Sequence, residues 1–367
     1  MIEILFYLFI AVVAIQFFYY LIVFGKFSFY KNQKSESQKL PISILVCAKN
    51  EEENVKNFIP LLLNQDYSNF EIVLIDDASR DETLEVFEEF EKNNRNIKLV
   101  KVENNEAFWG NKKFALTLGI KAAKYDNLLF IDADCYPKSK QWISEMSSHF
   151  NTEKTIVLGY GAYEKSNTFL NKIIRFETLL SATQYFSWAK LKKPYMGIGR
   201  NLAYNRQEFF AANGFISHIK VRSGDDDLFV NEASTDSNTT ICYSPESFTI
   251  SKPKTSFNSW INQKRRHVAT AKFYKSFDKL QLATFYLSQI LFIVLSVILI
   301  ISNFQWLIVL SLVGFRYLSS WITLGFSAAK LQEKDVMYWF PVIEIVLIFT
   351  QLYLFVINIF SKPVHWK

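Results

Sequence analysis

Asp132 and Asp134, separated only by Ala133, follow a short run of apolar residues and could hold a metal ion. Along an extended segment alternate side chains point to the same side, so the two carboxylates should converge on one point. Two carboxylates this close would repel each other unless a cation lay between them. Oxygen ligands of this kind, completed by substrate phosphates, suit Mg²⁺ or Mn²⁺. The pair therefore predicts a Mg²⁺ or Mn²⁺ site that serves a phosphorylated substrate.

Two further polar clusters stand where apolar runs end. One is Ala-Lys-Asn-Glu at residues 48–51, and the other is Asp-Asp-Ala-Ser-Arg-Asp at residues 76–81. The simpler interpretation is that such side chains cap the next helix, and Ser79 with Glu82 has the spacing of a capping box. Clusters that follow several parallel strands also meet at one edge of the sheet, where ligands bind.

The elements that must position these clusters alternate between strands and helices. Short apolar runs typical of strands occur at residues 41–48, 71–75, 97–102 and 127–131. Helical periodicity after the first run includes Val55, Phe58, Ile59, Leu62 and Leu63, and a later helix is expected over residues 111–124. Pro60 predicts a kink or an early end of the first helix. The alternation predicts an α/β fold with a mostly parallel sheet and helices on both faces.

Several function classes are disfavoured by what the sequence lacks. It has no GxxxxGK[ST] loop, and Gly197 and Gly199 come too late for a dinucleotide-binding Gly-x-Gly-x-x-Gly loop. Its three cysteines, Cys47, Cys135 and Cys242, form no CxxC pair, which argues against a structural zinc site or a disulfide framework. The net charge of +6 over 367 residues does not indicate nucleic acid, and its distribution fits a membrane surface better.

Long apolar segments occur near both ends of the chain. Residues 2–24 carry only one charge, and residues 281–302, 304–326 and 337–360 repeat the pattern. Each segment is long enough to cross a bilayer as a helix. Arg316 and Glu344 lie inside the last two segments, where a charge is costly in lipid. We expect them either to pair between helices or touch a bound lipid, or to lie near the interface.

Basic residues orient these segments, because they gather just after the first span and just before the second. Residues 169–193 form an amphipathic, aromatic-rich helix that either faces a core or lies at the bilayer surface. We expect an integral multi-pass protein of the cell (plasma or inner) membrane with its α/β domain in the cytoplasm. Its expected parts are a transmembrane helix (1–25), the α/β domain (40–250), a basic juxtamembrane segment (251–280) and three transmembrane helices (281–361).

Seven segments of the chain resemble the GT-A domain of family 2 glycosyltransferases. In order they are ISILVCAKNEEENV, IVLIDDASRDET, NKKFALTLGI, LLFIDADCYP, GRNLAYNRQEFF, SGDDDLF and QKRRH, and together they extend over residues 41–270. The resemblance implies a GT-A fold, which is a Rossmann-like fold of nucleotide-diphospho-sugar transferases. It also implies an inverting sugar transfer that depends on a metal ion.

The resemblance assigns roles at matching positions. Nucleotide-sugar contacts are implied for Ala48, Asn50, Glu51, Asp77, Lys112 and Asp132, and metal binding for Asp132 and Asp134. Asp77 matches a carboxylate that accepts a hydrogen bond from the base, typically uracil, and a carboxylate suits an imide N–H. Lys112 matches a basic position near the phosphates, although an ordinary solvated helix lysine is the alternative.

The run Ser223-Gly224-Asp225-Asp226-Asp227-Leu228 matches the family's general-base motif and puts Asp225 at the base position. Gly224 replaces an acidic residue of the family, so Asp226 is an alternative base, and Asp227 is counted with the acceptor-side residues. A carboxylate beside other carboxylates holds a proton more tightly, which suits a base. The alternative is an acidic run that caps a helix.

Residues 263–267 resemble the family's Gln-x-x-Arg-Trp motif, which lies near the leaving diphosphate and the acceptor. Gln263 and Arg266 match, Arg265 is counted with them, and His267 stands where tryptophan is usual. The missing indole removes a sugar-stacking face, which argues against processive polymerisation. The alternative is a basic cluster that meets anionic lipid headgroups.

We therefore expect an inverting, metal-dependent glycosyltransferase. Its donor would be a nucleotide-diphosphate sugar, UDP-linked, and its acceptor a membrane-associated lipid-linked or polysaccharide glycan. One alternative keeps the fold and makes polyprenyl-phosphate the acceptor. Another is a catalytically silent membrane scaffold that binds a nucleotide. Membrane lipids are expected partners, and nucleic acid is not.

Overall fold

The computed structural model describes residues 1–31, 39–103, 112–221 and 223–361. By their contacts these residues form two compact units. The α/β unit contains the described residues of 39–165 and of 192–254. A helical unit contains residues 1–31, 166–191 and 255–361.

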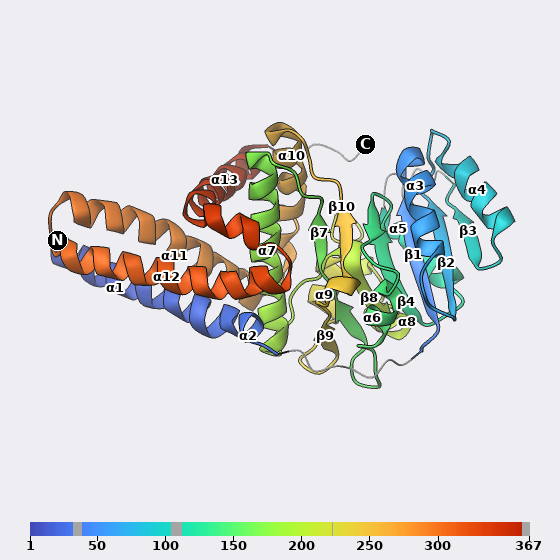
Figure 1. Cartoon of the computed structure of the whole chain (residues 1–367), viewed down its shortest axis with the longest axis horizontal. Coiled ribbons are helices and arrows are strands. Elements are labelled where there is room, and N and C mark those ends of the chain that lie inside the picture. The colour runs from blue at the N-terminus through green and yellow to red at the C-terminus, as the bar shows by residue number, and fades with distance from the viewer. Residues whose placement is uncertain (32–38, 104–111, 222, 362–367) are drawn as a thin grey trace. The chain divides into compact units, whose positions relative to one another are not determined.

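The α/β unit is built on a seven-stranded sheet with the order β3-β2-β1-β4-β8-β6-β9 (Figure 1). Its strands are β1 (Ile42–Ala48), β2 (Phe70–Asp76), β3 (Ile97–Lys101), β4 (Asn127–Asp132), β6 (Ile156–Leu158), β8 (Leu202–Asn205) and β9 (Thr239–Ile241). The first four strands in the order are parallel, as predicted, whereas β8 runs antiparallel to both β4 and β6. A second, three-stranded sheet joins β5 (Cys135–Pro137), β10 (Thr249–Ser251) and β7 (Gly161–Tyr163).

Helices cover both faces of the large sheet because its central strands are apolar on both sides. Ile44 and Val46 of β1 pack in one core cluster with Val55 and Ile59 of α3. Leu45, which alternates with them, faces α5 on the other side. The helices of this unit are α3 (Glu52–Leu63), α4 (Thr83–Asn93), α5 (Lys112–Ala122), α6 (Trp142–Ser147), α8 (Arg206–Ala211) and α9 (Asp227–Ala233), with 3₁₀ turns at Gly199–Asn201, Ile216–His218 and Pro245–Ser247.

Two expectations about helix ends are not met: the early end of the first helix at Pro60 and the capping box of Ser79 with Glu82. α3 continues through Pro60 and ends at Leu63, because a proline so near the end interrupts only the last turn. The capping box does not form, since the hydroxyl of Ser79 accepts a hydrogen bond from the Asn50 N–H instead. Asp81 takes its place and accepts the N–H of Thr83, the first residue of α4, at 3.1 Å.

The helical unit contains four helices long and apolar enough to cross a membrane. They are Ile2–Ser28, Ser276–Ile301, Trp306–Lys330 and Lys334–Phe360, with mean hydropathies between 1.6 and 2.5. The first comprises α1 (Ile2–Phe17), a π-helical segment (Phe18–Phe24) and α2 (Gly25–Ser28). The others are α11 (Ser276–Ile301), α12 (Trp306–Lys330) and a 3₁₀ segment (Lys334–Trp339) that continues into α13 (Phe340–Phe360). This agrees with the four spans predicted from the sequence.

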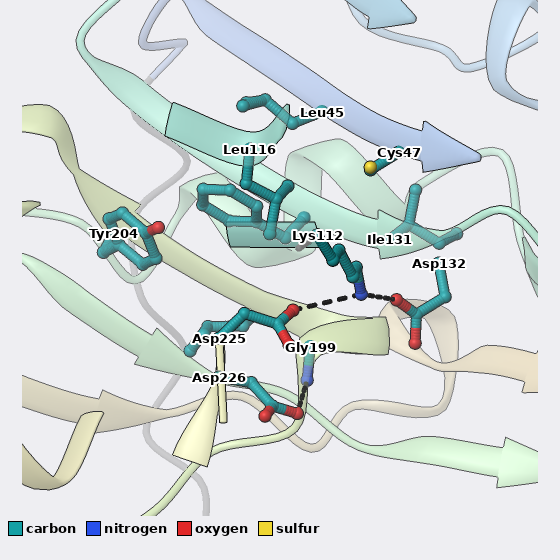
Figure 2. Close-up of a pocket in the computed structure, with 12 residues that line it drawn as sticks. Leu45, Cys47, Lys112, Leu116, Ile131, Asp132, Gly199, Tyr204, Asp225 and Asp226 are labelled. Carbon is teal, nitrogen blue, oxygen red and sulfur yellow. Dashed lines mark hydrogen bonds and ion pairs between the residues drawn. The ribbon is translucent and has the colours of Figure 1, made fainter. Parts of the chain in front are cut away.

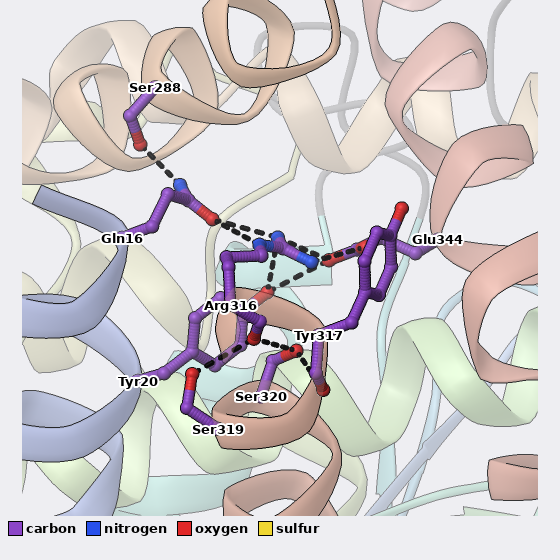
Figure 3. A network of polar contacts seen from close by, with 8 residues as sticks. All are labelled: Gln16, Tyr20, Ser288, Arg316, Tyr317, Ser319, Ser320 and Glu344. Carbon is purple, nitrogen blue, oxygen red and sulfur yellow. Dashed lines mark hydrogen bonds and ion pairs between the residues drawn. The ribbon is translucent and has the colours of Figure 1, made fainter. Parts of the chain in front are cut away.

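Arg316 and Glu344 pair inside this unit, which confirms the pairing interpretation and excludes the interfacial one (Figure 3). Both side chains are almost fully buried, and the guanidinium also donates to the amide oxygen of Gln16 at 2.7 Å. The hydroxyl of Tyr20 completes the group by donating to Glu344 at 2.9 Å. A buried pair of charges is tolerated when its remaining hydrogen-bonding groups are satisfied in this way.

The aromatic-rich helix α7 (Phe169–Lys190) belongs to the helical unit, and most of its residues are buried there. The core-facing interpretation of this helix is therefore correct. Arg175, in the first third of α7, is buried and forms ion pairs with Glu333 and Asp335, which lie at the start of the last long helix. The remaining elements are α10 (Phe257–Val268) and a 3₁₀ turn (Ala271–Phe273).

Candidate active site

The loops after β1 and β2 hold each other in place. The carbonyl oxygen of Ala48 accepts the N–H of Asp77 at 2.9 Å. The side chain of Asn50 accepts the N–H of Arg80 at 2.8 Å. Asn50 has φ of 55°, a left-handed conformation that asparagine adopts more readily than most residues. Three predicted nucleotide-binding residues, Ala48, Asn50 and Asp77, are thus brought together at one edge of the sheet.

Asp77 and Glu51 lie in these two hydrogen-bonded loops, and the pKa values of both carboxyl groups are raised. Burial raises the pKa of Asp77, and the ammonium of Lys49, 3.6 Å away, acts in the opposite direction. Burial also raises the pKa of Glu51, whose carboxylate accepts a hydrogen bond from Asn54 at 2.6 Å. Both groups are therefore less hydrated than ordinary surface carboxylates and suited to bind a polar ligand group.

Asp132 and Asp134 converge, although not by the alternation that we expected. Asp132 ends β4, and residues 133 and 134 form a turn before β5 begins at Cys135. The turn brings ligand atoms of Asp132, Asp134 and Cys135 within 4.8 Å of one another. Three such atoms at this spacing could hold one metal ion.

The donor chemistry of this group fits Mg²⁺ or Mn²⁺ through its two carboxylates. Asp134 is exposed, and partial desolvation followed by the nearby charge of Asp132 raises its pKa. Burial keeps the pKa of the Cys135 thiol well above its usual range, so this sulfur is protonated and a poor ligand. The thiol instead donates to Asp134 at 3.3 Å and contacts the hydroxyl of Ser251 at 2.9 Å.

Lys112 joins two of the predicted carboxylates directly (Figure 2). Its ammonium lies 2.8 Å from an oxygen of Asp132 and 3.0 Å from an oxygen of Asp225. These two negative charges keep the pKa of Lys112 well above its usual range against the opposing effect of burial. The three side chains line one pocket together with Cys47 and Gly199. The predicted metal-binding and base residues therefore belong to a single site.

The three aspartates of the acidic run have different surroundings. Asp226 accepts the N–H of Gly199 at 2.6 Å and that of Asp227 at 2.8 Å, so both its oxygens are used. Asp227 accepts the N–H of Leu228 at 2.8 Å. These two side chains cap α9, as the simpler interpretation of the run proposed. Asp225 differs because its carboxylate faces Lys112 and the pocket (Figure 2).

The pKa of Asp226 further separates it from Asp225. Burial, followed by the charges of Asp225 and Asp227, raises the pKa of Asp226 to about 8. A carboxyl group with that pKa is mostly protonated at pH 7 and cannot accept another proton. Asp226 is therefore less suited than Asp225 to accept a proton.

The structure explains why a glycine, Gly224, stands where the family motif has an acidic residue. Its φ is +91°, which side-chain-bearing residues rarely adopt. A Cβ at this position would also lie 2.6 Å from a methyl carbon of Leu228. The glycine therefore allows the chain to turn sharply into Asp225.

Lys113, next to Lys112, is a buried group that the sequence analysis missed. Its ammonium contacts the Nδ1 of His218 at 2.7 Å and donates to the carbonyl oxygens of His218 and Val221 at 2.8 and 2.9 Å. Burial lowers the pKa of Lys113 to about 8 and, with the positive charge of Lys113, lowers that of His218 to about 4. Lys113 thus fixes the segment that leads into the acidic run. A lysine inside a helical pattern carries no signal of such a role.

Arg200 is a second residue that the sequence analysis missed. Its guanidinium lies 4.3 Å from the centre of the Tyr163 ring and donates to the hydroxyl of Ser251 at 3.4 Å. Gly161 makes room for it, since a Cβ there would come within 2.4 Å of the Arg200 Nε. Within the described ranges, no carboxylate forms an ion pair with Arg200, although its charge lowers the proton affinity of Asp134. Arg200 is thus a fixed cation beside the candidate metal site.

The remaining predicted residues, Gln263, Arg265 and Arg266, belong to α10 in the helical unit. Arg265 is buried and donates to the side-chain oxygen of Asn358 at 3.1 Å and to the carbonyl oxygen of Ser361 at 2.9 Å. Burial lowers the pKa of Arg266. Gln263 is half-buried. The contacts of Arg265 tie α10 to the end of α13.

Comparison with known proteins places these features in context. Residues 43–216 match the family model of glycosyl transferase family 2. A poly-beta-1,6-N-acetyl-D-glucosamine synthase of Staphylococcus epidermidis is 39% identical over 102 residues, which cover 28% of this chain and 24% of that protein. The uncharacterized glycosyltransferase EpsJ of Bacillus subtilis is 25% identical over 227 residues, which cover 56% of this chain and 64% of that protein. These matches therefore span about a quarter to two thirds of the relatives' length.

A solved structure supports the fold. The mannosyltransferase PcManGT of Pyrobaculum calidifontis, in complex with GDP-Man and Mn²⁺, superposes with a TM-score of 0.58. The match covers 90% of this chain and 99% of that one at 16% identity. At this identity the likeness concerns the fold alone, and it confirms the predicted GT-A type of α/β unit.

Proposed function

We propose, from the match of residues 43–216 to the family model of glycosyl transferase family 2, that the chain is a metal-dependent, inverting sugar transferase. Its donor is a UDP-linked sugar, and its acceptor is a lipid-linked or polysaccharide glycan at a membrane. One observation carries the proposal: Asp132, Asp225 and Lys112 meet in one pocket, next to Asp134, at the carboxyl end of β4. This edge of an α/β sheet is where ligands of such folds bind.

The donor's nucleotide lies against the loops after β1 and β2. Asp77 accepts a hydrogen bond from the base, and Ala48, Asn50 and Glu51 line the same loops. Asp132 and Asp134 would hold a Mg²⁺ or Mn²⁺ ion, which neutralises charge on the diphosphate when bound. Lys112 and Arg200 add fixed positive charge from the chain itself.

Asp225 acts as the general base of the transfer. As the acceptor hydroxyl attacks the anomeric carbon, its proton passes to a carboxylate oxygen of Asp225. The bond between the anomeric carbon and the diphosphate oxygen breaks, and the bonding electrons leave with the diphosphate. Because the attack comes from the face opposite the leaving group, this single displacement inverts the anomeric centre.

The acceptor is proposed to be membrane-associated because four helices of the chain are long and apolar enough to cross a bilayer. The lysines and arginines that flank these helices favour a cytoplasmic catalytic domain by the positive-inside rule. The likeness to the poly-beta-1,6-N-acetyl-D-glucosamine synthase of Staphylococcus epidermidis supports a polysaccharide product. We place the protein in the cell (plasma or inner) membrane.

The test uses membranes that contain the full chain, Mn²⁺ and a panel of labelled nucleotide sugars, followed by extraction of lipids and polymers. Asp134→Ala and Asp225→Asn should each abolish transfer of the label while the protein remains folded. Asp236→Asn is the matched control, because Asp236 is an exposed aspartate of the same unit that lines no pocket described above. Full activity in both site variants would overturn the assignment.

The same variants distinguish a hydroxyl acceptor from the polyprenyl-phosphate alternative. A phosphate nucleophile is already ionised and needs no base. Loss of transfer in Asp134→Ala together with retained transfer in Asp225→Asn would favour a polyprenyl-phosphate acceptor. A chain that binds the nucleotide but neither transfers nor hydrolyses any donor would be the silent scaffold.

A further inference from the structure

One ammonium group serves two carboxylates with different proposed tasks. Lys112 lies 2.8 Å from Asp132, a proposed metal ligand, and 3.0 Å from Asp225, the proposed base (Figure 2). The lysine side chain is 28% exposed, and it projects from the first residue of α5. It is therefore within reach of a ligand that enters the pocket.

We propose that Lys112 is an exchangeable counter-ion that links donor binding to the base. Before the donor binds, its single ammonium pairs with both Asp132 and Asp225. When a divalent cation arrives together with the donor's diphosphate, the ammonium leaves both carboxylates and pairs with the phosphate oxygens. This inference rests on the proposed function, and it adds that metal binding requires the nucleotide and that Asp225 is released only in the donor complex.

The charges at the site give the reason for this order. A bare cation that approaches Asp132 must share the carboxylate with an ammonium already in contact, and two positive charges so close repel each other strongly. Arg200 and Lys254 add positive potential at Asp134. The metal alone should therefore bind weakly. A diphosphate changes the balance because it brings negative oxygens that can accept both the cation and the lysine.

The side-chain chemistry of lysine allows this exchange. Its ammonium is a compact charge on a flexible stem, so it can turn from one oxygen to another without movement of the helix. An ammonium held against Asp225 opposes the uptake of a proton by that carboxylate. Once the ammonium has turned to the phosphate, the Asp225 carboxylate has lost this counter-ion and can take up a proton more readily. The base thus becomes effective only when there is a donor to attack.

The experiment measures Mn²⁺ binding by electron paramagnetic resonance with the full chain in detergent, with and without UDP. Wild type should bind Mn²⁺ weakly alone and much more tightly with UDP. Lys112→Met should tighten the binding of Mn²⁺ alone by about tenfold or more, since the competing ammonium is gone. The same variant should reduce the gain that UDP provides. Lys112→Arg keeps the charge and should stay close to wild type in both measurements.

Lys254→Met is the matched control, because its charge acts on Asp134 without a direct ion pair. It removes the same unit of charge and should change the binding of Mn²⁺ alone much less than Lys112→Met does. Equal effects of the two variants, or unchanged Mn²⁺ binding in Lys112→Met, would overturn the exchange. Size-exclusion chromatography and thermal unfolding show whether each variant is folded.

The readout also separates this inference from the proposed function. Cooperative binding of Mn²⁺ and UDP that depends on Lys112, in a chain that transfers no sugar, would refute the transferase and retain the exchange. Sugar transfer in wild type with Mn²⁺ binding that is insensitive to Lys112→Met would retain the transferase and refute the exchange.

Discussion

The guanidinium of Arg316 on α12 and the carboxylate of Glu344 on α13 lie face to face, joined by two hydrogen bonds of 2.7 Å (Figure 3). Both side chains are almost fully buried among helices that are long and apolar enough to cross a membrane. Gln16 satisfies the other side of the guanidinium, so the pair also connects the first helix to the last two.

Removal of one member of this pair should therefore be worse than removal of both. Glu344→Met leaves the buried charge of Arg316 without its partner, and we expect a loss of about 3–5 kcal/mol in stability. The double variant Arg316→Met/Glu344→Met should recover a large part of that loss. Thermal unfolding of the detergent-solubilised chain measures both. Additive effects of the two single substitutions would contradict the direct pairing.

Arg200 should matter for donor affinity and little for folding. Its guanidinium has a stacking partner and one long hydrogen bond, but no carboxylate ion pair in the described structure. We expect Arg200→Gln to raise the dissociation constant of UDP in the presence of Mn²⁺ by about tenfold, because loss of one charge-assisted hydrogen bond weakens binding by about that factor. Arg95→Gln is the control, because Arg95 is exposed at the amino-terminal edge of the sheet. Calorimetric titration gives both constants, and equal values for Arg200→Gln and wild type would contradict this role.

Lys113 is expected to act as a positioning residue. Lys113→Met leaves two carbonyl oxygens and a histidine nitrogen without their donor, which should cost about 1–3 kcal/mol in stability. Because these acceptors lie just before the acidic run, the turnover number should fall while UDP affinity stays within about twofold of wild type. Steady-state kinetics measures the turnover number, and titration with UDP measures the affinity. A parallel loss of UDP affinity would show instead that the whole site had been disturbed.

The raised pKa of Asp226 predicts a pH dependence of stability. The folded chain holds this proton up to about pH 8, whereas the unfolded chain releases it near the ordinary value of 3.8. Between these values the folded state binds more protons, so this carboxyl group makes stability fall as pH rises, with a slope of at most about 1.4 kcal/mol per pH unit.

Asp226→Asn removes this titration, because an amide carries no ionisable proton. The variant should therefore show a flatter fall in melting temperature than wild type between pH 5 and 8. Asp236→Asn, which changes an exposed aspartate, should keep the wild-type slope. Identical slopes for Asp226→Asn and wild type would show that Asp226 is ionised throughout this range.

The central strands could be predicted because a strand buried on both faces is a continuous apolar run. β1, β2 and β4 have this character, whereas β3 is a partly exposed edge strand, and all four lie within two residues of their expected bounds. The strands of the second half could not be found in this way. β5, β7 and β10 contain three residues each, which is too short for a period to be visible, and their pairing depends on contacts far apart in the sequence.

In the candidate site, too, some residues could be predicted from the sequence and others could not. Asp132, Asp134 and Asp225 stand in recognisable patterns, so their grouping could be expected from the sequence. The contact that Lys112 makes with both Asp132 and Asp225 is a property of the folded chain alone. Arg200 and Lys113 lie in segments that resemble the family but were given no role there, and their importance comes from a stacked ring and a buried set of acceptors. Single basic residues become visible as site residues only when their surroundings are known.

The anchoring of Arg265 has a consequence for how the chain can be shortened. This arginine, within the basic motif of α10, is held by Asn358 and Ser361 at the far end of α13. A protein truncated at residue 350 would keep all predicted site residues and still lose the contacts of Arg265 with Asn358 and Ser361. The end of α13 therefore helps to hold the basic motif of α10 in place, although the two are far apart in the sequence.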